Sequence, residues 1–305
     1  MLMISRLAII FFLFASFNKS GNDPYLVILG ITQDAGYPQI GCDRECCKKY
    51  WDKKIARQKV SCLALFDPST NQKWIFDATP DLTEQSHEAE RLQKGNISGI
   101  FLTHAHIGHY TGLMYLGREA LSAKEIPVYA MPRMYDYLGQ SGPWNQLVSL
   151  KNIQLQKLKA DSSVKLTDKI SVTAILVPHR DEFSETVGYS IKTGSKTVLF
   201  IPDIDKWQKW DRDIRQLVKQ YDHFFLDGTF YKDGELPGRN MSEVPHPFIE
   251  ESMDLFNDLS LSEKQKIFFI HFNHTNPLID RSSKECKDVK GKGFNVAMEG
   301  LKISL

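Results

Sequence analysis

The sequence lacks a surplus of charge of either sign. Its 38 lysine and arginine residues nearly balance 37 aspartate and glutamate residues, and the formal net charge is +1. This balance gives no clear footprint for nucleic acid and no acidic tail, so we expect a small-molecule substrate as the partner. Low-complexity segments, an internal repeat and a linker between two domains are also missing. Assembly of two copies into a homodimer is left as an alternative to a monomer.

The chain also has no apolar run of the ~20 residues that a membrane-spanning helix needs. Its apolar N-terminal run, residues 7–17, follows Arg6 and precedes a polar stretch. A basic residue before a short apolar core is typical of a secretory signal. We therefore expect residues 1–23 to direct export to the periplasm or outside, leaving no stable membrane span, and residues 24–305 to form one domain. The alternative is an ordinary N-terminal strand or helix in a cytoplasmic protein.

Cysteine is scarce, and the odd count of five argues against a complete disulfide framework. Three of the five fall within six residues: Cys42, Cys46 and Cys47. Thiolates at such spacing suit a tetrahedral structural zinc, and His274 is the candidate fourth ligand. The alternative is a disulfide from this loop to Cys62 or Cys286, which an exported protein would permit.

Short apolar runs separated by turn residues predict a mixed α/β fold. The predicted strands are residues 25–29, 62–66, 74–76, 97–102, 128–131, 170–177, 186–191, 197–201, 223–226, 267–270, 294–296 and 301–303. The predicted helices are residues 82–94, 111–122, 206–221 and 248–259. Hairpins followed by strand–helix alternations indicate two mixed sheets with helices outside.

Three of the nine histidines lie within six residues, directly after the predicted strand 97–102: His104, His106 and His109. Imidazole is a strong ligand for zinc and similar ions. His104 and His106 can project from one loop toward one point, and His109 can face the same cavity from the start of the next helix. The pattern predicts a metal site, and a surface histidine run is the alternative.

Further metal ligands are expected at the ends of later strands. His179, Asp203 and His271 each follow a predicted strand. Side chains at strand ends are held by a rigid scaffold, where sites are usually built. Each residue alone could be an ordinary hydrogen-bonded residue, but the ordered set favours a metal centre.

At this point the sequence resembles a known superfamily. The segment 104–109, HAHIGH, resembles the HxHxDH motif of the metallo-β-lactamase superfamily. The resemblance implies an αββα sandwich with two metals at one edge of the sheets. It also implies a first metal on His104, His106 and His179, and a second on His109 and His271, with Asp203 between them.

Four segments carry a closer resemblance to pyrroloquinoline quinone (PQQ) biosynthesis protein B and to the phosphonate-pathway cyclic phosphodiesterase. They are residues 30–42, 77–82, 104–113 and 271–280. The phosphodiesterase branch carries a cysteine-rich loop with the usual spacing Cys-x-Cys-x-x-Cys. Here the spacing is Cys-x-x-x-Cys-Cys, so which thiols bind zinc stays open.

Gly108 departs from the superfamily motif, which has aspartate at that position. Three consequences stay open. The site holds one metal; it holds two, with water or another carboxylate such as Asp34 or Asp205 filling in; or it has lost catalysis and serves in binding.

The expected chemistry is hydrolysis by a metal-bound hydroxide, because a bound metal lowers the pKa of water from 15.7 toward ~7. Asp203 would orient the hydroxide. His246, between Pro245 and Pro247, is the candidate general acid for the leaving group; the alternative is a loop histidine that caps the next helix. The resemblance to the branch that includes tRNase Z supports the catalytic role.

We therefore expect a zinc-dependent hydrolase, acting on a phosphodiester or another small ester. Manganese and iron are alternative active-site metals. The competing functions are a metal-dependent oxidoreductase in quinone cofactor (PQQ) maturation and, because of Gly108, a non-catalytic metal- or ligand-binding protein.

Overall fold

The computed structural model describes residues 21–305. The proposed export segment therefore lies almost entirely outside the described residues. Among those described, no helix combines the length and the apolar character needed to cross a bilayer.

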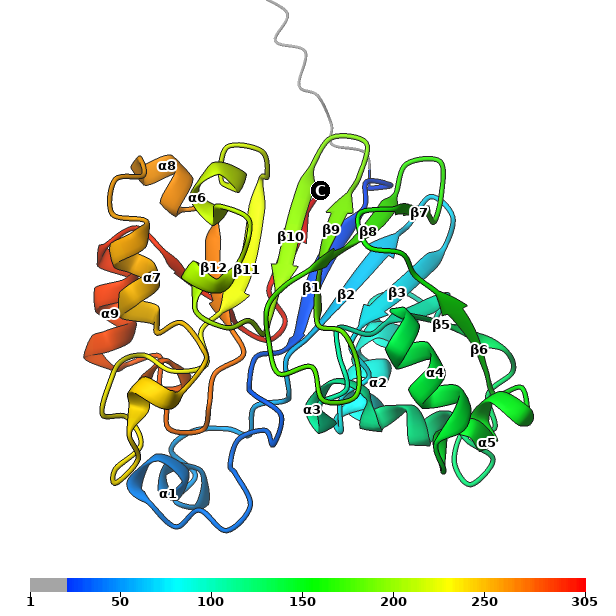
Figure 1. Cartoon of the computed structure of the whole chain (residues 1–305), viewed down its shortest axis with the longest axis horizontal. Coiled ribbons are helices and arrows are strands. Elements are labelled where there is room, and N and C mark those ends of the chain that lie inside the picture. The colour runs from blue at the N-terminus through cyan, green and yellow to red at the C-terminus, as the bar shows by residue number, and fades with distance from the viewer. Residues whose placement is uncertain (1–20) are drawn as a thin grey trace, which may run out of the picture.

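Two seven-stranded sheets form the centre of the molecule (Figure 1). The first sheet has the spatial order β14 (Lys302–Ser304), β1 (Tyr25–Gly30), β2 (Cys62–Asp67), β3 (Gln72–Phe76), β4 (Gly99–Phe101), β5 (Ile126–Ala130), β6 (Ile153–Lys157). The strands from β14 to β3 pair antiparallel, and those from β3 to β6 pair parallel.

The second sheet has the order β13 (Asn295–Val296), β12 (Ile267–Ile270), β11 (His223–Asp227), β10 (Thr197–Ile201), β9 (Val187–Lys192), β8 (Ser171–Leu176), β7 (Ser163–Lys165). The strands from β10 to β13 pair parallel. In these parallel strands the apolar side chains run almost without interruption, as in FFL of β11 and IFFI of β12, because both faces of the sheet are covered.

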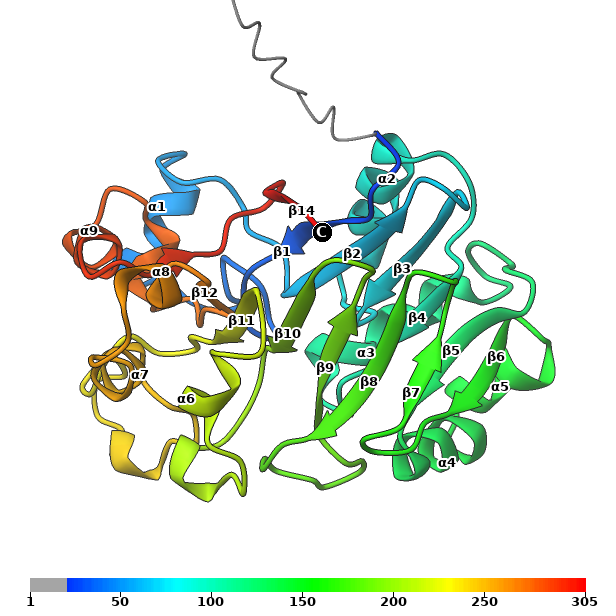
Figure 2. The same ribbon diagram turned by 90° about the horizontal axis from the view of Figure 1, so that it is seen from above.

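Helices cover the outer faces of both sheets (Figure 2). The α-helices are α1 (Glu45–Trp51), α2 (Leu82–Leu92), α3 (Ile107–Tyr110), α4 (Pro132–Gln140), α5 (Trp144–Ser149), α6 (Ile214–Leu217), α7 (Ile249–Leu255), α8 (Leu261–Lys264) and α9 (Lys284–Gly291). Short 3₁₀ helices are η1 (Thr111–Leu116), η2 (Trp207–Lys209), η3 (Met241–Glu243) and η4 (Pro277–Ile279). The described chain is thus an α/β sandwich of two mixed sheets with outer helices, as the sequence predicted.

Aromatic side chains join the two sheets in the main core. Phe76 of β3 lies 5.2 Å from Phe101 of β4 and 6.2 Å from Phe200 of β10, between ring centroids. Tyr189 of β9 also packs on Phe101, and its hydroxyl donates to the carbonyl of Leu102 at 2.5 Å. This contact fixes the end of β4, which is where the histidine segment begins.

Two predicted helices are wrong in extent. Residues 111–122 form only the 3₁₀ turn η1, because the chain turns extended at Gly117. Residues 206–221 form η2 and the short helix α6, which starts afresh where the carboxylate of Asp213 accepts from the backbone N–H of Arg215. The apolar spacing of Trp207 and Trp210 reflects contacts with other elements instead: their indole N–H groups donate to Ser252 and Leu176.

Candidate metal centre

Polar side chains from both sheets meet at one edge of the sandwich. The segment 103–109 follows β4, Asp203 follows β10, Asp227 ends β11, and His271 follows β12. In open α/β sheets ligands bind outside the carboxyl ends of the parallel strands, and these residues all lie at such ends. The fold thus brings together residues that lie far apart in the sequence.

One cluster consists of His104, His106, His179 and Asp203. Oδ2 of Asp203 lies 3.3 Å from Nε2 of His104 and 3.2 Å from Nε2 of His179. Nε2 of His104 also lies 2.8 Å from Nδ1 of His106. Ligand atoms about 2.0–2.2 Å from a zinc ion in tetrahedral geometry are roughly 3.3–3.5 Å apart, so the spacing fits a divalent metal.

The outer nitrogens of these rings are held by other side chains. Nδ1 of His104 lies 3.0 Å from the hydroxyl of Thr103, and Nδ1 of His179 lies 3.1 Å from Oδ1 of Asp205. Such contacts fix the ring orientation of metal-binding histidines and direct the free nitrogen to the ion. Asp205 therefore orients His179, while its other oxygen accepts from Lys209.

A second cluster consists of Asp34, His109 and His271. Nε2 of His109 lies 3.2 Å from Oδ1 of Asp34 and 3.2 Å from Nε2 of His271. The outer nitrogens contact Asp77 at 2.7 Å and Thr229 at 2.9 Å, respectively.

Two residues of this region have a left-handed backbone. His271 has φ = 69° and Asp77 has φ = 70°. For residues with a Cβ this conformation is uncommon, and it clusters at functional sites where the surrounding structure enforces it. At Asp77 it is supported by the backbone N–H, which donates to Phe101, while the carboxylate accepts from the N–H and hydroxyl of Thr103.

His246 lies beside the first cluster but is held differently. Its Nδ1 lies 2.8 Å from Oδ2 of Asp227 and 3.2 Å from Oδ1 of Asp203. Asp227 already accepts from the backbone N–H groups of Ile204 and Thr229, so its carboxylate serves to orient His246. Burial alone would lower the pKa of His246, but Asp227 and Asp203 raise it to about 9.

The carboxylates of the centre have no lysine or arginine as an ion-pair partner among the described residues. Within residues 21–305, the ion-pair partners of Asp34, Asp77, Asp203 and Asp227 are all histidines. Burial favours the neutral acid, yet His179 and His246 hold the pKa of Asp203 well below its usual range. Buried anions need compensating charge, and a divalent cation supplies it.

Unpaired polar atoms point to the same conclusion. Oδ1 of Asp34, Nε2 of His179 and Oδ1 of Asp203 are buried and make no hydrogen bond of good geometry among the described residues, although each lies 3.2 Å from a nitrogen or oxygen atom of the centre. Buried polar groups are normally hydrogen-bonded, and unpaired ones indicate a missing ligand or ion. The donor set of imidazoles and carboxylates fits zinc, manganese or iron.

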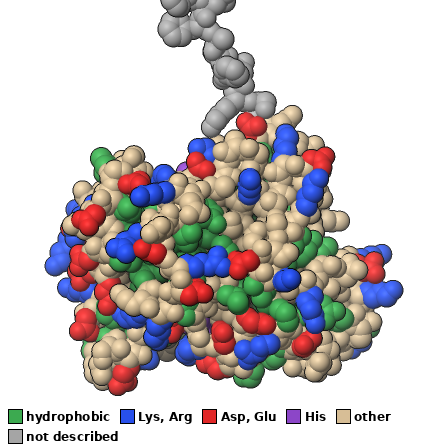
Figure 3. Space-filling view, turned by 45° about the horizontal axis from the view of Figure 1, so that its top comes forward, with side chains coloured by type: hydrophobic (Ala, Val, Ile, Leu, Met, Phe, Trp, Pro, Cys, Tyr) green, Lys and Arg blue, Asp and Glu red, His purple; other side chains and the backbone are tan. Residues whose placement is uncertain are grey.

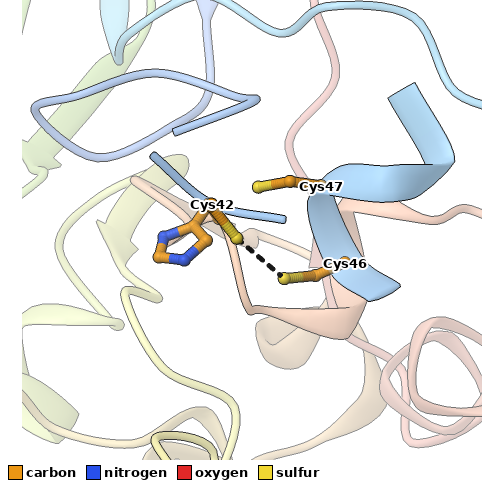
Figure 4. A group of neighbouring side chains, drawn as sticks. Cys42, Cys46 and Cys47 are labelled. Atoms are coloured by element: carbon orange, nitrogen blue, oxygen red, sulfur yellow. Dashed lines mark hydrogen bonds between the residues drawn. The ribbon is translucent and has the colours of Figure 1, made fainter. Parts of the chain in front are cut away.

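The cysteine loop forms a separate cluster (Figure 4). Cys42, Cys46, Cys47 and His274 place one ligand atom each within 4.8 Å of the others. The sulfur atoms of Cys42 and Cys46 are 3.7 Å apart, close to the roughly 3.8 Å expected between thiolates 2.3 Å from a tetrahedral zinc. All five cysteines are free, so the structure contains no disulfide to Cys62 or Cys286. Burial, followed by the charge of Arg44, lowers the pKa of His274 to about 4, which keeps its imidazole neutral.

The structure brings the sequence-predicted residues together in these clusters, and it adds residues that the sequence analysis missed. Asp77 and Asp227 were not predicted. Each ends or follows a strand, as Asp203 does, and that position was the available signal. Asp34 was named only as one of two carboxylates that could replace the missing aspartate.

Two facing mixed sheets with a histidine- and aspartate-lined centre at one edge define the metallo-β-lactamase fold. Residues 72–272 match the family described as the Beta-lactamase superfamily domain. The chain belongs to this superfamily.

Among its relatives, coenzyme PQQ synthesis protein B of Methylorubrum populi is 25% identical over 310 residues, covering 92% of this chain and 100% of that protein. The same protein of Xanthomonas campestris is 24% identical over 309 residues, covering 92% and 99%. The crystal structure of Zn²⁺-bound PqqB from Methylobacterium extorquens superimposes with a TM-score of 0.77 at 23% identity, covering 92% and 100%.

A diphosphatase of the PhnP family follows with a TM-score of 0.64 at 20% identity, covering 92% of this chain and 97% of that one. Human tRNase Z, short form, gives 0.57 at 15% identity, covering 92% and 98%. These likenesses show the shared fold.

Proposed function

We propose that this protein is a metal-dependent hydrolase that acts on a phosphodiester or another small ester. The observation that carries the proposal is the set of buried carboxylates whose ion-pair partners are histidines throughout residues 21–305. Such a set binds a cation, and the superfamily contains mainly metallo-hydrolases.

His104, His106, His179 and Asp203 would hold the first metal. A divalent ion held there would supply a Lewis acid and would lower the pKa of water. Asp203 would accept a hydrogen bond from the attacking water and so orient it. The rings keep their orientation through Thr103 and Asp205, which reduces the reorganisation needed during the reaction.

His246 would donate the proton that the leaving group needs. Asp227 holds its Nδ1, and Nε2 makes no hydrogen bond within residues 21–305, so it is free to face a substrate. The neighbouring Asp227 raises the pKa of this imidazole, which favours its protonated form. A protonated histidine beside a water-orienting carboxylate is the arrangement required for general-acid catalysis.

The names of two structural neighbours, a diphosphatase and a tRNase Z, motivate phosphorus esters as the first substrates to examine. The experiment is hydrolysis of bis(p-nitrophenyl) phosphate by the chain stripped of metal and reloaded with Zn²⁺ or Mn²⁺. We expect turnover that requires the metal and is lost in His179→Ala. Turnover that persists after metal removal and in His179→Ala would contradict the proposal. The absence of turnover with Zn²⁺ and with Mn²⁺, on this substrate and on a panel of other small esters, would also contradict it.

A second candidate is a role like that of coenzyme PQQ synthesis protein B, because full-length proteins of that name are 24–25% identical to this chain. In this case the same histidine centre would hold iron for oxidation of a quinone precursor. Metal analysis of the purified protein separates the candidates: iron with redox turnover supports the second, and zinc or manganese with ester hydrolysis supports the first.

A further inference from the structure

The space beside Gly108, where the superfamily motif has aspartate, is occupied by Asp34. A Cβ built on Gly108 would overlap Cα and Oδ1 of Asp34 and would lie 2.9 Å from its Cβ. Non-bonded carbon atoms pack at about 3.5–4.0 Å. Residue 108 must therefore be glycine as long as Asp34 keeps its place, and only one of the two positions can supply a carboxylate.

The loop that carries Asp34 is fixed against the strand end that carries His271. The backbone N–H of Gln33 donates to the carbonyl of Phe272 at 2.9 Å, and the N–H of Phe272 donates to the carbonyl of Ile31 at 2.8 Å. The two bonds join the segment just before Asp34 to Phe272, the residue just after His271. The carboxylate and the imidazole are thus placed as a pair before any ion binds.

The Asp34 carboxylate lies against His109, which is its ion-pair partner within residues 21–305. Its Oδ1 is buried, has no hydrogen-bond partner among residues 21–305, and lies 3.2 Å from Nε2 of His109. Nε2 of His271 lies 3.2 Å from the same nitrogen. Ligand atoms around one ion of zinc size have about this separation.

We propose that Asp34 supplies, from the loop between β1 and α1, the carboxylate ligand that Gly108 cannot, so that Asp34, His109 and His271 bind a second divalent cation. The carboxylate ligand comes from another position of the chain, and glycine at position 108 leaves the space that Asp34 occupies. This inference rests on the proposed metal-dependent function, but metal binding tests it without turnover.

The primary experiment counts metal per chain by elemental analysis after loading with Zn²⁺, for wild type and Asp34→Asn. Asparagine keeps the shape and removes the charge. We expect Asp34→Asn to lose about one zinc per chain, or to bind that zinc at least ~10–100-fold more weakly. The cysteine cluster contributes equally to both proteins. Equal zinc content and equal affinity would overturn the proposal.

Two further variants decide which ion is lost. If Asp34 and His271 bind the same ion, the double variant Asp34→Asn/His271→Ala loses no more zinc than His271→Ala alone. The double variant Asp34→Asn/His179→Ala, in contrast, loses one ion more than Asp34→Asn alone or His179→Ala alone. Zinc content of His271→Ala equal to that of wild type would show that there is no second ion and would also overturn the proposal. Asp168→Asn is the matched control, because the Asp168 side chain is 97% exposed and its ion-pair partner among the described residues is Lys165.

Gly108→Ala gives an independent readout. The added methyl must displace the Asp34 loop, so we expect loss of the same zinc together with a lower melting temperature. Gly139→Ala is the control, because a Cβ there meets its nearest atom, on Leu155, at an ordinary 3.8 Å. Gly108→Ala with full zinc content would contradict the exclusion between the two positions. A wild-type protein that binds both ions but hydrolyses no ester would support this inference and reject the proposed function. A protein that hydrolyses esters, and whose zinc content is unchanged in Asp34→Asn, would support the proposed function and reject this inference.

Discussion

At the scale of the residue, His246 is the side chain whose role depends most on its neighbours. It is buried between Asp227 and Asp203, and a small apolar cluster of Phe230, Met241, Val244 and Phe248 packs the loop that carries it. A loop fixed in this way can hold a proton donor in one orientation, which general-acid catalysis requires.

We predict that His246→Ala lowers turnover by ~100-fold or more while the metal stays bound. The reason is loss of the proton for the leaving group, so the effect should be large for alkyl esters and small for p-nitrophenyl esters, whose leaving group needs no proton. Turnover of both substrate types, with metal content as the control, checks this. An equal loss on both would mean that His246 acts on something other than the leaving group.

Glu235 is a partly buried carboxylate outside the metal centre. Its oxygens accept from the backbone N–H of Tyr231 and from the hydroxyl of Thr275. Burial is the larger influence and raises its pKa to about 7, whereas the hydrogen bond from Thr275 opposes the rise. A glutamate in an unfolded chain has a pKa of ~4.3. The folded state therefore favours the protonated form.

The sign of the pH dependence follows. Between about pH 4.5 and 7 the unfolded chain has released the proton that the folded chain keeps, so the stability from this group is full at low pH and falls as pH rises, at most ~1.4 kcal/mol per unit. We predict that Glu235→Gln removes this slope. Urea unfolding at several pH values checks it, with the exposed Glu243→Gln as control. Parallel slopes for Glu235→Gln and wild type would contradict the prediction.

Most candidate ligands were identifiable from the sequence, and the family resemblance divided the histidines between two metal positions in the same way as the clusters of the structure. His104, His106 and His109 were recognisable from their spacing, and Gly108 was recognisable as a departure. That Asp34 fills the space beside Gly108 depends on a contact between residues 74 positions apart along the chain. No local pattern encodes such a contact.

At the scale of the element, strands were easier to predict than helices. The buried strands β2, β10, β11 and β12 were predicted nearly to their ends, because apolar runs bounded by turn residues are a strong signal. The short helices α1, α4, α5, α8 and α9 were not predicted. They have few residues facing the core and are stabilised by packing, which a periodic pattern of four to nine residues does not reveal.

Helix α1 has one buried residue, Cys47, and its Cys46 and Tyr50 are partly buried against the main core. With Cys42, Cys46 and His274 it faces a position suited to zinc. A bound ion would join this helix to the loop after β12, in the way that structural zinc stabilises small elements without a large apolar core.

We predict that Cys47→Ser loses one zinc per chain and lowers the melting temperature, while ester hydrolysis at a temperature where the variant is folded changes little. Structural zinc binding is coupled to folding, which is the reason for the thermal effect. Elemental analysis and a thermal melt of each protein check it. Cys62→Ala is the control for metal content, because the Cys62 thiol contacts backbone carbonyls outside the cluster. Unchanged zinc in Cys47→Ser would show that the loop is not a metal site.

At the scale of the whole molecule, basic and acidic side chains are interspersed on the face shown in Figure 3. This agrees with the formal net charge of +1.

The candidate metal centre is built from residues of both sheets. Asp34, His104, His106 and His109 come from segments after strands of the first sheet, whereas His179, Asp203 and His271 come from the second. Asp34 and Asp203, one from each half, repel one another through their charges, and both have histidines as ion-pair partners. A cation that binds the folded chain and not the unfolded one stabilises by RT ln(1 + [M]/Kd), about 4 kcal/mol at a metal concentration of 1,000 Kd.

We predict that removal of metal by a chelator lowers the melting temperature by roughly 10 °C, since 1 kcal/mol shifts the melting of a domain of ~150–250 residues by about 2–4 °C. Zn²⁺ added back should restore it, and the restoration should increase with the logarithm of zinc concentration above Kd. The same titration on Cys47→Ser isolates the histidine centre from the cysteine loop. Elemental analysis first shows that chelator-treated Cys47→Ser contains no metal. If this protein melts at the same temperature before and after zinc is added back, the histidine centre does not hold the two sheets together. The buried carboxylates would then be tolerated by the histidines alone.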